Sequence, residues 1–282
     1  MRNKMFYAMF AMLVSAAHAR TGNFSEISVD LKLDEITYVV GERIRGVVDI
    51  KSVTTDVVSA GYADSPDRFF IEVYRAASHE QLQRLGQKKF TAPFLIKANE
   101  GQKLETYLGD HYHLLSEGRY LARPVLVHGG YRYEGQYRAF DVIGGMDVAK
   151  AVQMFSTRKN LRRTFTLVRW SRNGYEHLFL RAEDSYDDGA NSSVRRTTDI
   201  GPFMKSTQPT ISIMPGGEVV VIHRNGADSF VRSEFWSLPD ELDFRSRTSI
   251  LDPETAGQQR VRQIYEEAGG VQPVDKPWWK FW

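Results

Sequence analysis

The segment Glu183–Asn191 concentrates carboxylates around Gly189, which is a composition typical of calcium-binding loops. Its order departs from an EF-hand loop, because the acids do not alternate and no glutamate closes the loop. Two interpretations stay open, a solvated loop between strands or a calcium site. The departures favour the loop, so we expect no cofactor, with calcium as the alternative. The ligands of the alternative site would be Asp184, Asp187, Asp188 and Asn191.

A second set of metal-ligand residue types is His111 and His113, which flank Tyr112. On a strand both imidazoles would point to the same face, and His128 is a candidate third ligand. Half-exposed histidines beside a turn explain the same spacing, and nothing in the sequence fixes the third ligand.

Four common catalytic motifs are absent from the sequence. It contains no G-x-S-x-G elbow, no H-E-x-x-H pair, no G-x-x-x-x-G-K-[ST] loop and no G-x-G-x-x-G helix start. Glycoside hydrolysis needs only two carboxylates about 5–9 Å apart, and no pair stands out from the 35 acidic residues. We therefore predict a non-catalytic binding or envelope-assembly role. The alternative is a carbohydrate-active enzyme or a glycan-binding module.

Aromatic residues supply the candidate binding groups. Clustered Trp and Phe side chains at the C-terminus expose apolar surface unless something covers them. They either fold back over a sheet or dock a protein partner, a glycan or a membrane interface. These tail residues are Trp278, Trp279, Phe281 and Trp282. For the glycan alternative, the candidates for stacking on sugar rings are Tyr131, Tyr133, Tyr137 and Trp170.

The first 19 residues have the three parts of a secretory signal peptide. Arg2 and Lys4 precede an apolar stretch that ends near Ala17, and Ala17-His18-Ala19 offers a cleavage site. The apolar stretch is shorter than the ~20 residues of a spanning helix. We expect an exported protein, periplasmic or extracellular in a bacterium, with no transmembrane segment after cleavage.

Charge and cysteine content narrow the class of partner. The chain has 37 basic and 35 acidic residues, and the signal peptide holds two of the basic ones, which leaves 35 against 35. A neutral mature chain lacks the positive field that nucleic-acid binding needs. Arginine pairs such as Arg162-Arg163 and Arg195-Arg196 are expected on solvated faces. The sequence contains no cysteine, so the apolar core alone must hold the fold.

Residues 24–144 are predicted to form a β-sandwich of about seven short strands. Ile27, Val29, Leu31 and Leu33 alternate with polar residues, as in a half-buried strand. Leu114–Leu121 places a turn before Tyr120. It resembles the approach to strand F of immunoglobulin-like domains, where a tyrosine hydroxyl bonds back to nearby backbone. Tyr38–Glu42 likewise resembles the A-to-B passage of bacterial exported Ig-like domains. This resemblance implies an Ig-like fold and no specific function. Ala77–Leu85 has helical spacing.

Residues 145–250 are predicted to form a smaller antiparallel β-meander domain of five strands in one sheet. Asn173-Gly174 and Pro215-Gly216-Gly217 are hairpin turns by composition. Met146–Phe155 is predicted as a short amphipathic helix or a connector. Residues 251–282 are predicted as a C-terminal helix, which begins at Asp252-Pro253, followed by the aromatic tail. The fold class is thus mainly all-β, with an Ig-like antiparallel β-sandwich, a β-meander domain and a C-terminal helix. The expected partner is a cell-envelope protein or a surface glycan.

Overall fold

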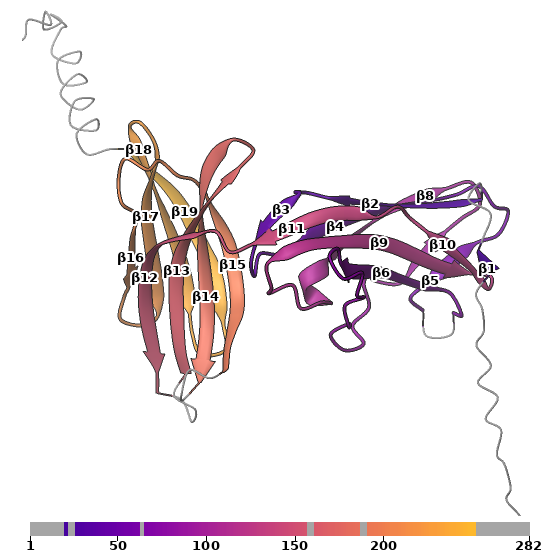
Figure 1. The fold of residues 1–282 in the computed structure, drawn as a ribbon, viewed down its shortest axis with the longest axis horizontal. Helices are drawn as coiled ribbons and strands as arrows, with labels where there is room; N and C mark the ends of the chain where they lie inside the picture. The colour runs from indigo at the N-terminus through magenta and orange to yellow at the C-terminus, as the bar shows by residue number, and fades with distance from the viewer. Residues whose placement is uncertain (1–19, 22–25, 63–64, 157–160, 187–190, 252–282) are drawn as a thin grey trace, which may run out of the picture.

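The computed structural model describes residues 20–21, 26–62, 65–156, 161–186 and 191–251, and nearly all of its elements are β-strands. Within these ranges, one short 3₁₀ helix, η1 (Leu108–Asp110), accompanies the strands. The strands form two sandwiches, the first within residues 20–143 and the second within residues 146–251. In Figure 1 the strands of the first run across the view and those of the second run up it. The predicted all-β fold class is confirmed.

The first sandwich is built around one long central strand, β9. One edge of β9 pairs antiparallel with β6, and its other edge is shared by β11 and β10. Two short strands, β3 and β1, extend the sheet in parallel beside β11 and β10. The bounds are β1 Arg20–Thr21, β3 Thr37–Val39, β6 Arg68–Arg75, β9 Gly118–His128, β10 Tyr131–Glu134 and β11 Arg138–Ile143.

A three-stranded antiparallel sheet, in the order β2-β4-β8, packs against this large sheet, and the pair β5-β7 completes the sandwich. The bounds are β2 Ile27–Leu33, β4 Arg45–Ser52, β5 Val58–Ala60, β7 Phe94–Ile96 and β8 Gly101–Tyr107.

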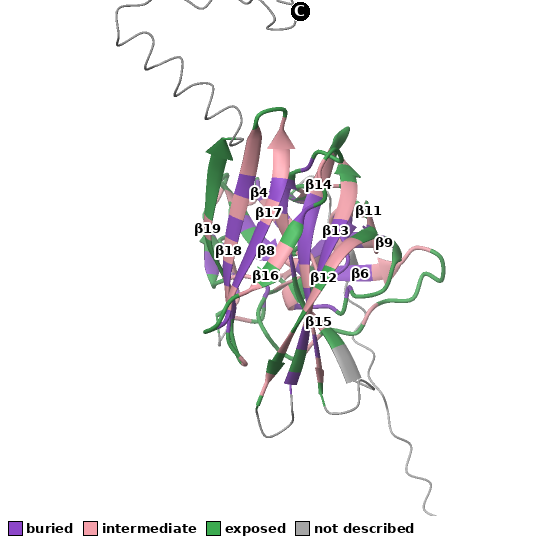
Figure 2. Cartoon of the chain, turned by 90° about the vertical axis from the view of Figure 1, so that its left-hand side faces the viewer, coloured by how far each residue is buried: buried purple, intermediate pink, exposed green. Residues whose placement is uncertain are grey.

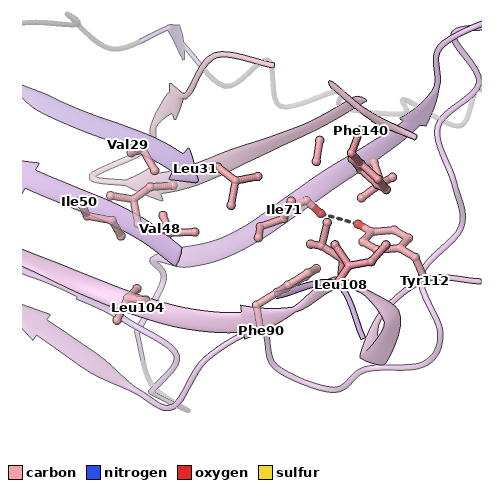
Figure 3. Close-up of a cluster of buried hydrophobic side chains, with 14 of the residues drawn as sticks. Val29, Leu31, Val48, Ile50, Ile71, Phe90, Leu104, Leu108, Tyr112 and Phe140 are labelled. Carbon is pink, nitrogen blue, oxygen red and sulfur yellow. Dashed lines mark hydrogen bonds between the residues drawn. The ribbon is translucent and has the colours of Figure 1, made fainter. Parts of the chain in front are cut away.

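The core of the first sandwich follows from the predicted alternation. Leu31, Val48 and Ile50 are fully buried between the sheets (Figure 3), and burial of each such side chain contributes about 1.5–3 kcal/mol. Two tyrosines fix the β8–β9 connection. The hydroxyl of Tyr112 donates to the carbonyl of Ile71, and that of Tyr120 donates to the carbonyl of Ser116 at 2.7 Å. The hydrogen bond expected for Tyr120 is confirmed.

The second sandwich consists of two four-stranded antiparallel meanders, β12-β13-β14-β15 and β16-β17-β18-β19. Their facing sides share one core, which includes Phe165, Leu180, Val221 and Phe235. Figure 2 shows the buried bands that run along β13, β14, β17 and β18. The bounds are β12 Met146–Phe155, β13 Leu161–Arg172, β14 Tyr175–Tyr186, β15 Asn191–Pro202, β16 Thr210–Ile213, β17 Glu218–Gly226, β18 Ser229–Ser237 and β19 Leu242–Leu251.

Both predicted hairpin turns are confirmed. Asn173 and Gly174 have φ of 52° and 82° between the paired residues Arg172 and Tyr175, which is the backbone of a type I′ turn. Gly216 and Gly217 also have positive φ, between β16 and β17.

The predicted helix or connector at Met146–Phe155 is wrong, because this segment is strand β12 and pairs with β13 along its length. Large apolar side chains also occur on the exposed face of β12, at Met146, Val152 and Met154, and a register shift between Asp147 and Ala149 adds to the irregularity. The segment therefore lacks the two-residue alternation of a half-buried strand. Ala77–Leu85 forms no helix either. Its backbone bonds to β6 instead, through Leu82 N to Val73 O at 2.8 Å.

The prediction of one sheet of five strands in the second half is also wrong. The structure adds strands β12, β15 and β19 to the five predicted ones, and the eight strands form two facing sheets. β15 and β19 lie at sheet edges and are mostly polar, so their sequences lack the alternation of a half-buried strand. The predicted signal peptide and C-terminal helix lie outside the described residues.

Candidate binding site at the junction of the two sandwiches

The two sandwiches meet where the loop after β3 lies against β15. Thr197 donates its backbone N–H to the carbonyl of Gly41 at 2.9 Å, and its hydroxyl donates to the carbonyl of Val40 at 2.6 Å. Gly41 has φ of 80°, and a Cβ on it would lie 2.2 Å from Cγ1 of Val194. Glycine is therefore required at position 41 both for the backbone conformation and for the close approach of β15.

An apolar cluster forms the centre of the junction. Val39 from the first sandwich is buried against Val168 and Phe179, which point outward from the β12–β15 sheet. Ile143 and Trp170 pack at its margin. Only Gly144 and Gly145 separate β11 from β12, and a Cβ on Gly145 would lie 2.4 Å from Cγ1 of Val168.

A charged cluster around Arg172 flanks the apolar contact. The side chain of Arg172 is 10% exposed, and its guanidinium lies 2.7 Å from Oε2 of Glu42 and 3.1 Å from Oδ2 of Asp199. Burial raises the pKa of Glu42 above its ordinary value, and the bond from Arg172 opposes this shift. Glu42 belongs to the first sandwich, whereas Arg172 and Asp199 belong to the second. The ion pair between Arg172 and Glu42 therefore connects the two sandwiches.

A cleft of about 460 Å³ opens beside these contacts, with residues of both sandwiches in its walls. We call it the arginine cleft, after Arg43, Arg195 and Arg196, which line it together with the apolar Leu85, Leu114 and Leu115. Its two lining carboxylates each have a cation from outside the cleft, and Asp110 also lies 3.7 Å from Arg43. Glu42 bonds Arg172, and Asp110 lies 2.7 Å from Nζ of Lys88. The cleft therefore carries an excess of positive charge.

A second cavity, of about 500 Å³, lies at the link between the sandwiches. We call it the Trp170 cavity. Besides Trp170, the cavity is lined by four charged residues, Glu117, Arg169, Glu176 and Lys205. Cavities of both sizes fall in the range of ordinary small-ligand sites, about 300–1,000 Å³.

The structure does not bring the four predicted sugar-stacking residues together. Tyr133 is 4% exposed in the core of the first sandwich, so the expectation that its ring is exposed is wrong: it lies on the inner face of β10. Tyr131 is exposed at the start of β10, and Trp170 lines the second cavity. Tyr137 is exposed beside Tyr74, and the guanidinium of Arg123 lies 4.8 Å from its ring centroid.

Asp184 cannot serve as a loop ligand for calcium. It is buried, and both of its carboxylate oxygens accept from the guanidinium of Arg163, at 2.6 and 3.0 Å. Asp187, Asp188 and the side chain of Asn191 lie outside the described residues, so calcium binding there stays a prediction. Within the described ranges, no three His, Asp or Glu side chains are grouped so that they could hold a metal ion. His111 is buried and stacks on Phe90, whereas His113 is exposed, so the two imidazoles do not share a face.

The predicted tail residues Trp278, Trp279, Phe281 and Trp282 lie outside the described part of the chain. No helix in the described part is long and apolar enough to cross a membrane.

Two arginines at key positions were not predicted as site residues. Arg163 is fully buried, which contradicts the expectation that Arg162-Arg163 lies on a solvated face. Arg163 is two residues before Phe165 and four before Leu167, so on a strand it lies on the same face as these core residues. This spacing is the sequence signal for its burial. Arg172 is in phase with Val168 and Trp170 on the opposite face of β13. Its partner Glu42 is 130 residues away in sequence, so no local pattern links them.

Comparisons with known proteins define no family for this chain. No protein-family model matches, and no curated protein matches. Among solved structures, Spo0M, the sporulation control protein of Bacillus subtilis, has 10% identity and a TM-score of 0.29 over 86% of this chain and 97% of its own. The class 5 fimbriae chaperone CfaA has 6% identity and a TM-score of 0.23 over 79% and 99%.

The Pseudomonas fluorescens DNA glycosylase AlkC, bound to DNA containing an abasic site analog, has 14% identity and a TM-score of 0.28. That match covers 42% of this chain and 30% of AlkC, so it spans less than a third of that protein. All three TM-scores are too low to assign a fold family or a function.

Proposed function

We propose that the chain is an exported, non-catalytic binding protein that holds an acidic segment of a cell-envelope partner protein in the arginine cleft. The observation that carries this proposal is the excess of positive charge in the cleft. Arg43, Arg195 and Arg196 line a space with only two carboxylates, and each of these carboxylates also has a cation from outside the cleft. Arg43 lies 3.7 Å from Asp110 and Arg195 lies 3.2 Å from Asp184, whereas Arg196 bonds the carbonyl of Leu242. Complementary charge steers an acidic partner to such a site and selects against basic ones.

The walls of the cleft suit a peptide segment rather than a bare anion. Leu85, Leu114 and Leu115 provide apolar surface next to the arginines, and Leu115 is 39% exposed. Apolar anchors supply most of the binding free energy at protein interfaces, whereas charges at the rim mainly set specificity and association rate. In a segment that alternates acidic and apolar residues, the acidic side chains can pair with the arginines and the apolar ones can pack against the leucines.

Export remains part of the proposal through the signal peptide predicted at residues 1–19. The periplasm or the extracellular space of a bacterium is the compartment that it implies. The aromatic tail at residues 278–282 is a second candidate contact for the same partner.

The test is capture of partner proteins from an envelope extract by the mature chain and by matched variants. Arg43→Glu/Arg196→Glu replaces two of the three cleft cations by carboxylates and so reverses the charge of the cleft. Both substitutions should be tolerated, because Arg43 is 57% exposed and lies 3.7 Å from the solvent-accessible Asp110, and the side chain of Arg196 donates to the carbonyl of Leu242. Arg162→Glu/Arg245→Glu makes the same charge change on exposed residues that do not line the cleft.

We expect the wild type and the control variant to enrich the same partner, and the cleft variant to lose it. Equal enrichment by the cleft variant would overturn the proposal. A chain that ends at Pro277 tests the contribution of the tail separately.

A further inference from the structure

The Trp170 cavity has a different chemistry from the arginine cleft. Trp170 packs at the margin of the apolar cluster formed by Val39, Val168 and Phe179, and it also lines the cavity. The indole is therefore supported by protein on one part of its surface while another part meets the cavity. A tryptophan held in this way provides a rigid apolar plane, at little further cost in side-chain entropy.

Polar groups of both hydrogen-bonding types surround this plane. Glu117 and Glu176 supply carboxylate acceptors, and Arg169 and Lys205 supply cationic donors. Glu176 lies 3.0 Å from Lys205 as an ion pair. Because two acidic and two basic residues line the cavity, its formal charge balances, and neither anions nor cations are favoured as ligands.

Arg169 has unused hydrogen-bonding capacity. In the described chain its guanidinium donates to the thioether sulfur of Met146, at 3.1 Å from Nε and 2.8 Å from Nη2. A thioether is a weak acceptor, and a guanidinium has five N–H donors. A ligand that brings hydroxyl or carbonyl oxygens to Arg169 would therefore gain hydrogen bonds that the protein does not provide.

We propose that the Trp170 cavity binds one pyranose residue of an uncharged glycan. A pyranose has an apolar C–H face that matches the indole plane and a rim of hydroxyls that both donate and accept. The carboxylates of Glu117 and Glu176 accept from those hydroxyls, and Arg169 and Lys205 donate to them. The site lies apart from the arginine cleft, so this inference does not rest on the proposed function.

The experiment measures binding of three neutral oligosaccharides, namely tetra-N-acetylchitotetraose, maltotetraose and cellotetraose. The full mature chain is titrated by calorimetry and by saturation-transfer NMR. Trp170→Leu removes the aromatic plane but keeps an apolar side chain against the junction cluster. Trp236→Leu is the matched control, since Trp236 is on β18 and does not line this cavity.

We expect at least one of the three sugars to bind the wild type and the Trp236→Leu variant with similar Kd. Trp170→Leu should weaken that binding about tenfold, the size of a lost aromatic contact. Arg169→Met should weaken it by about the same factor, through lost hydrogen bonds. The cleft variant Arg43→Glu/Arg196→Glu should bind sugar normally.

Two results would overturn the inference. One is that the folded wild type binds none of the three sugars at millimolar concentration. The other is that Trp170→Leu binds a sugar as tightly as the wild type does, with circular dichroism spectra that match.

Discussion

Replacement of Arg163 by methionine should destabilise the second sandwich by about 3–5 kcal/mol. The guanidinium of Arg163 is fully buried between the two sheets and forms a bidentate ion pair with Asp184. It also donates to the hydroxyl of Ser237 at 2.9 Å and to three carbonyls of the β18–β19 turn. These carbonyls are those of Leu238 at 2.7 Å, Pro239 at 3.1 Å and Glu241 at 3.2 Å.

The magnitude follows from what the substitution leaves behind. Methionine fills a similar volume, so the main cost is a buried Asp184 whose remaining cation is Arg195, at 3.2 Å. Each turn carbonyl that loses its donor adds about 1 kcal/mol unless water reaches it. The double variant Arg163→Met/Asp184→Leu removes the uncompensated charge, so it should be more stable than Arg163→Met alone.

Urea unfolding followed by circular dichroism measures these differences in the free energy of unfolding. In a thermal melt, the Tm of Arg163→Met should fall by about 10 °C. Arg162→Met is the matched control, because Arg162 is the exposed neighbour on the opposite face of β13 and should change stability by less than about 0.5 kcal/mol. If Arg163→Met is too unstable to purify, Arg163→Lys keeps the charge and should lose an intermediate amount. A loss below about 1 kcal/mol for Arg163→Met would refute the assignment of a buried, fully bonded guanidinium.

Three further predictions concern other buried contacts. Burial lowers the pKa of His223 from 6.5 to about 4, so the unfolded chain takes up this proton first as the pH falls. The associated stability is complete above pH 6.5 and is lost toward pH 4, by at most about 3 kcal/mol. Urea titrations of wild type and His223→Asn across that window should show the wild type falling more steeply, and parallel curves would contradict the assignment. Tyr120→Phe removes the hydrogen bond to Ser116 and should cost about 1 kcal/mol in the same assay; an unchanged midpoint would argue against that bond. Gly41→Ala forces a Cβ to within 2.2 Å of Val194 Cγ1, so hydrogen exchange at the amide of Thr197 should accelerate, whereas Gly109→Ala, with no atom within 4 Å of its Cβ, should leave it unchanged.

The sequence was sufficient for the features that depend on short-range patterns. The all-β class, the Asn173-Gly174 hairpin and the hydrogen bond of Tyr120 each follow from residues close together in the chain, and the structure confirms them. Strand β12 has no clear signal in the sequence, because exposed apolar residues such as Val152 and Met154 and a bulge near its start hide the two-residue period. Edge strand β15 was missed because it presents mostly polar residues.

The candidate site was much less predictable than the fold class. The Arg172–Glu42 pair and the walls of both cavities are formed by segments that are distant in sequence. Neither composition nor local residue spacing predicts contacts of this kind. Residue type alone makes Trp170 a candidate for sugar stacking, whereas the charged residues that line the same cavity are apparent only in the structure. Tyr133 was selected for the same reason, but the inward direction of its side chain on β10 places it in the core.

The short connection of Gly144 and Gly145 has a consequence for how the molecule recognises ligands. With two residues between β11 and β12, and with Gly41 in contact with β15, neither sandwich can swing away without exposing the buried Val39 and Phe179. Burial of these side chains at the junction therefore contributes to the stability of both halves. Because the cavities at their junction exist before any ligand arrives, little conformational free energy is lost on binding. Selectivity is then set by the fixed shape and charge of the walls, and association does not wait for a closing motion.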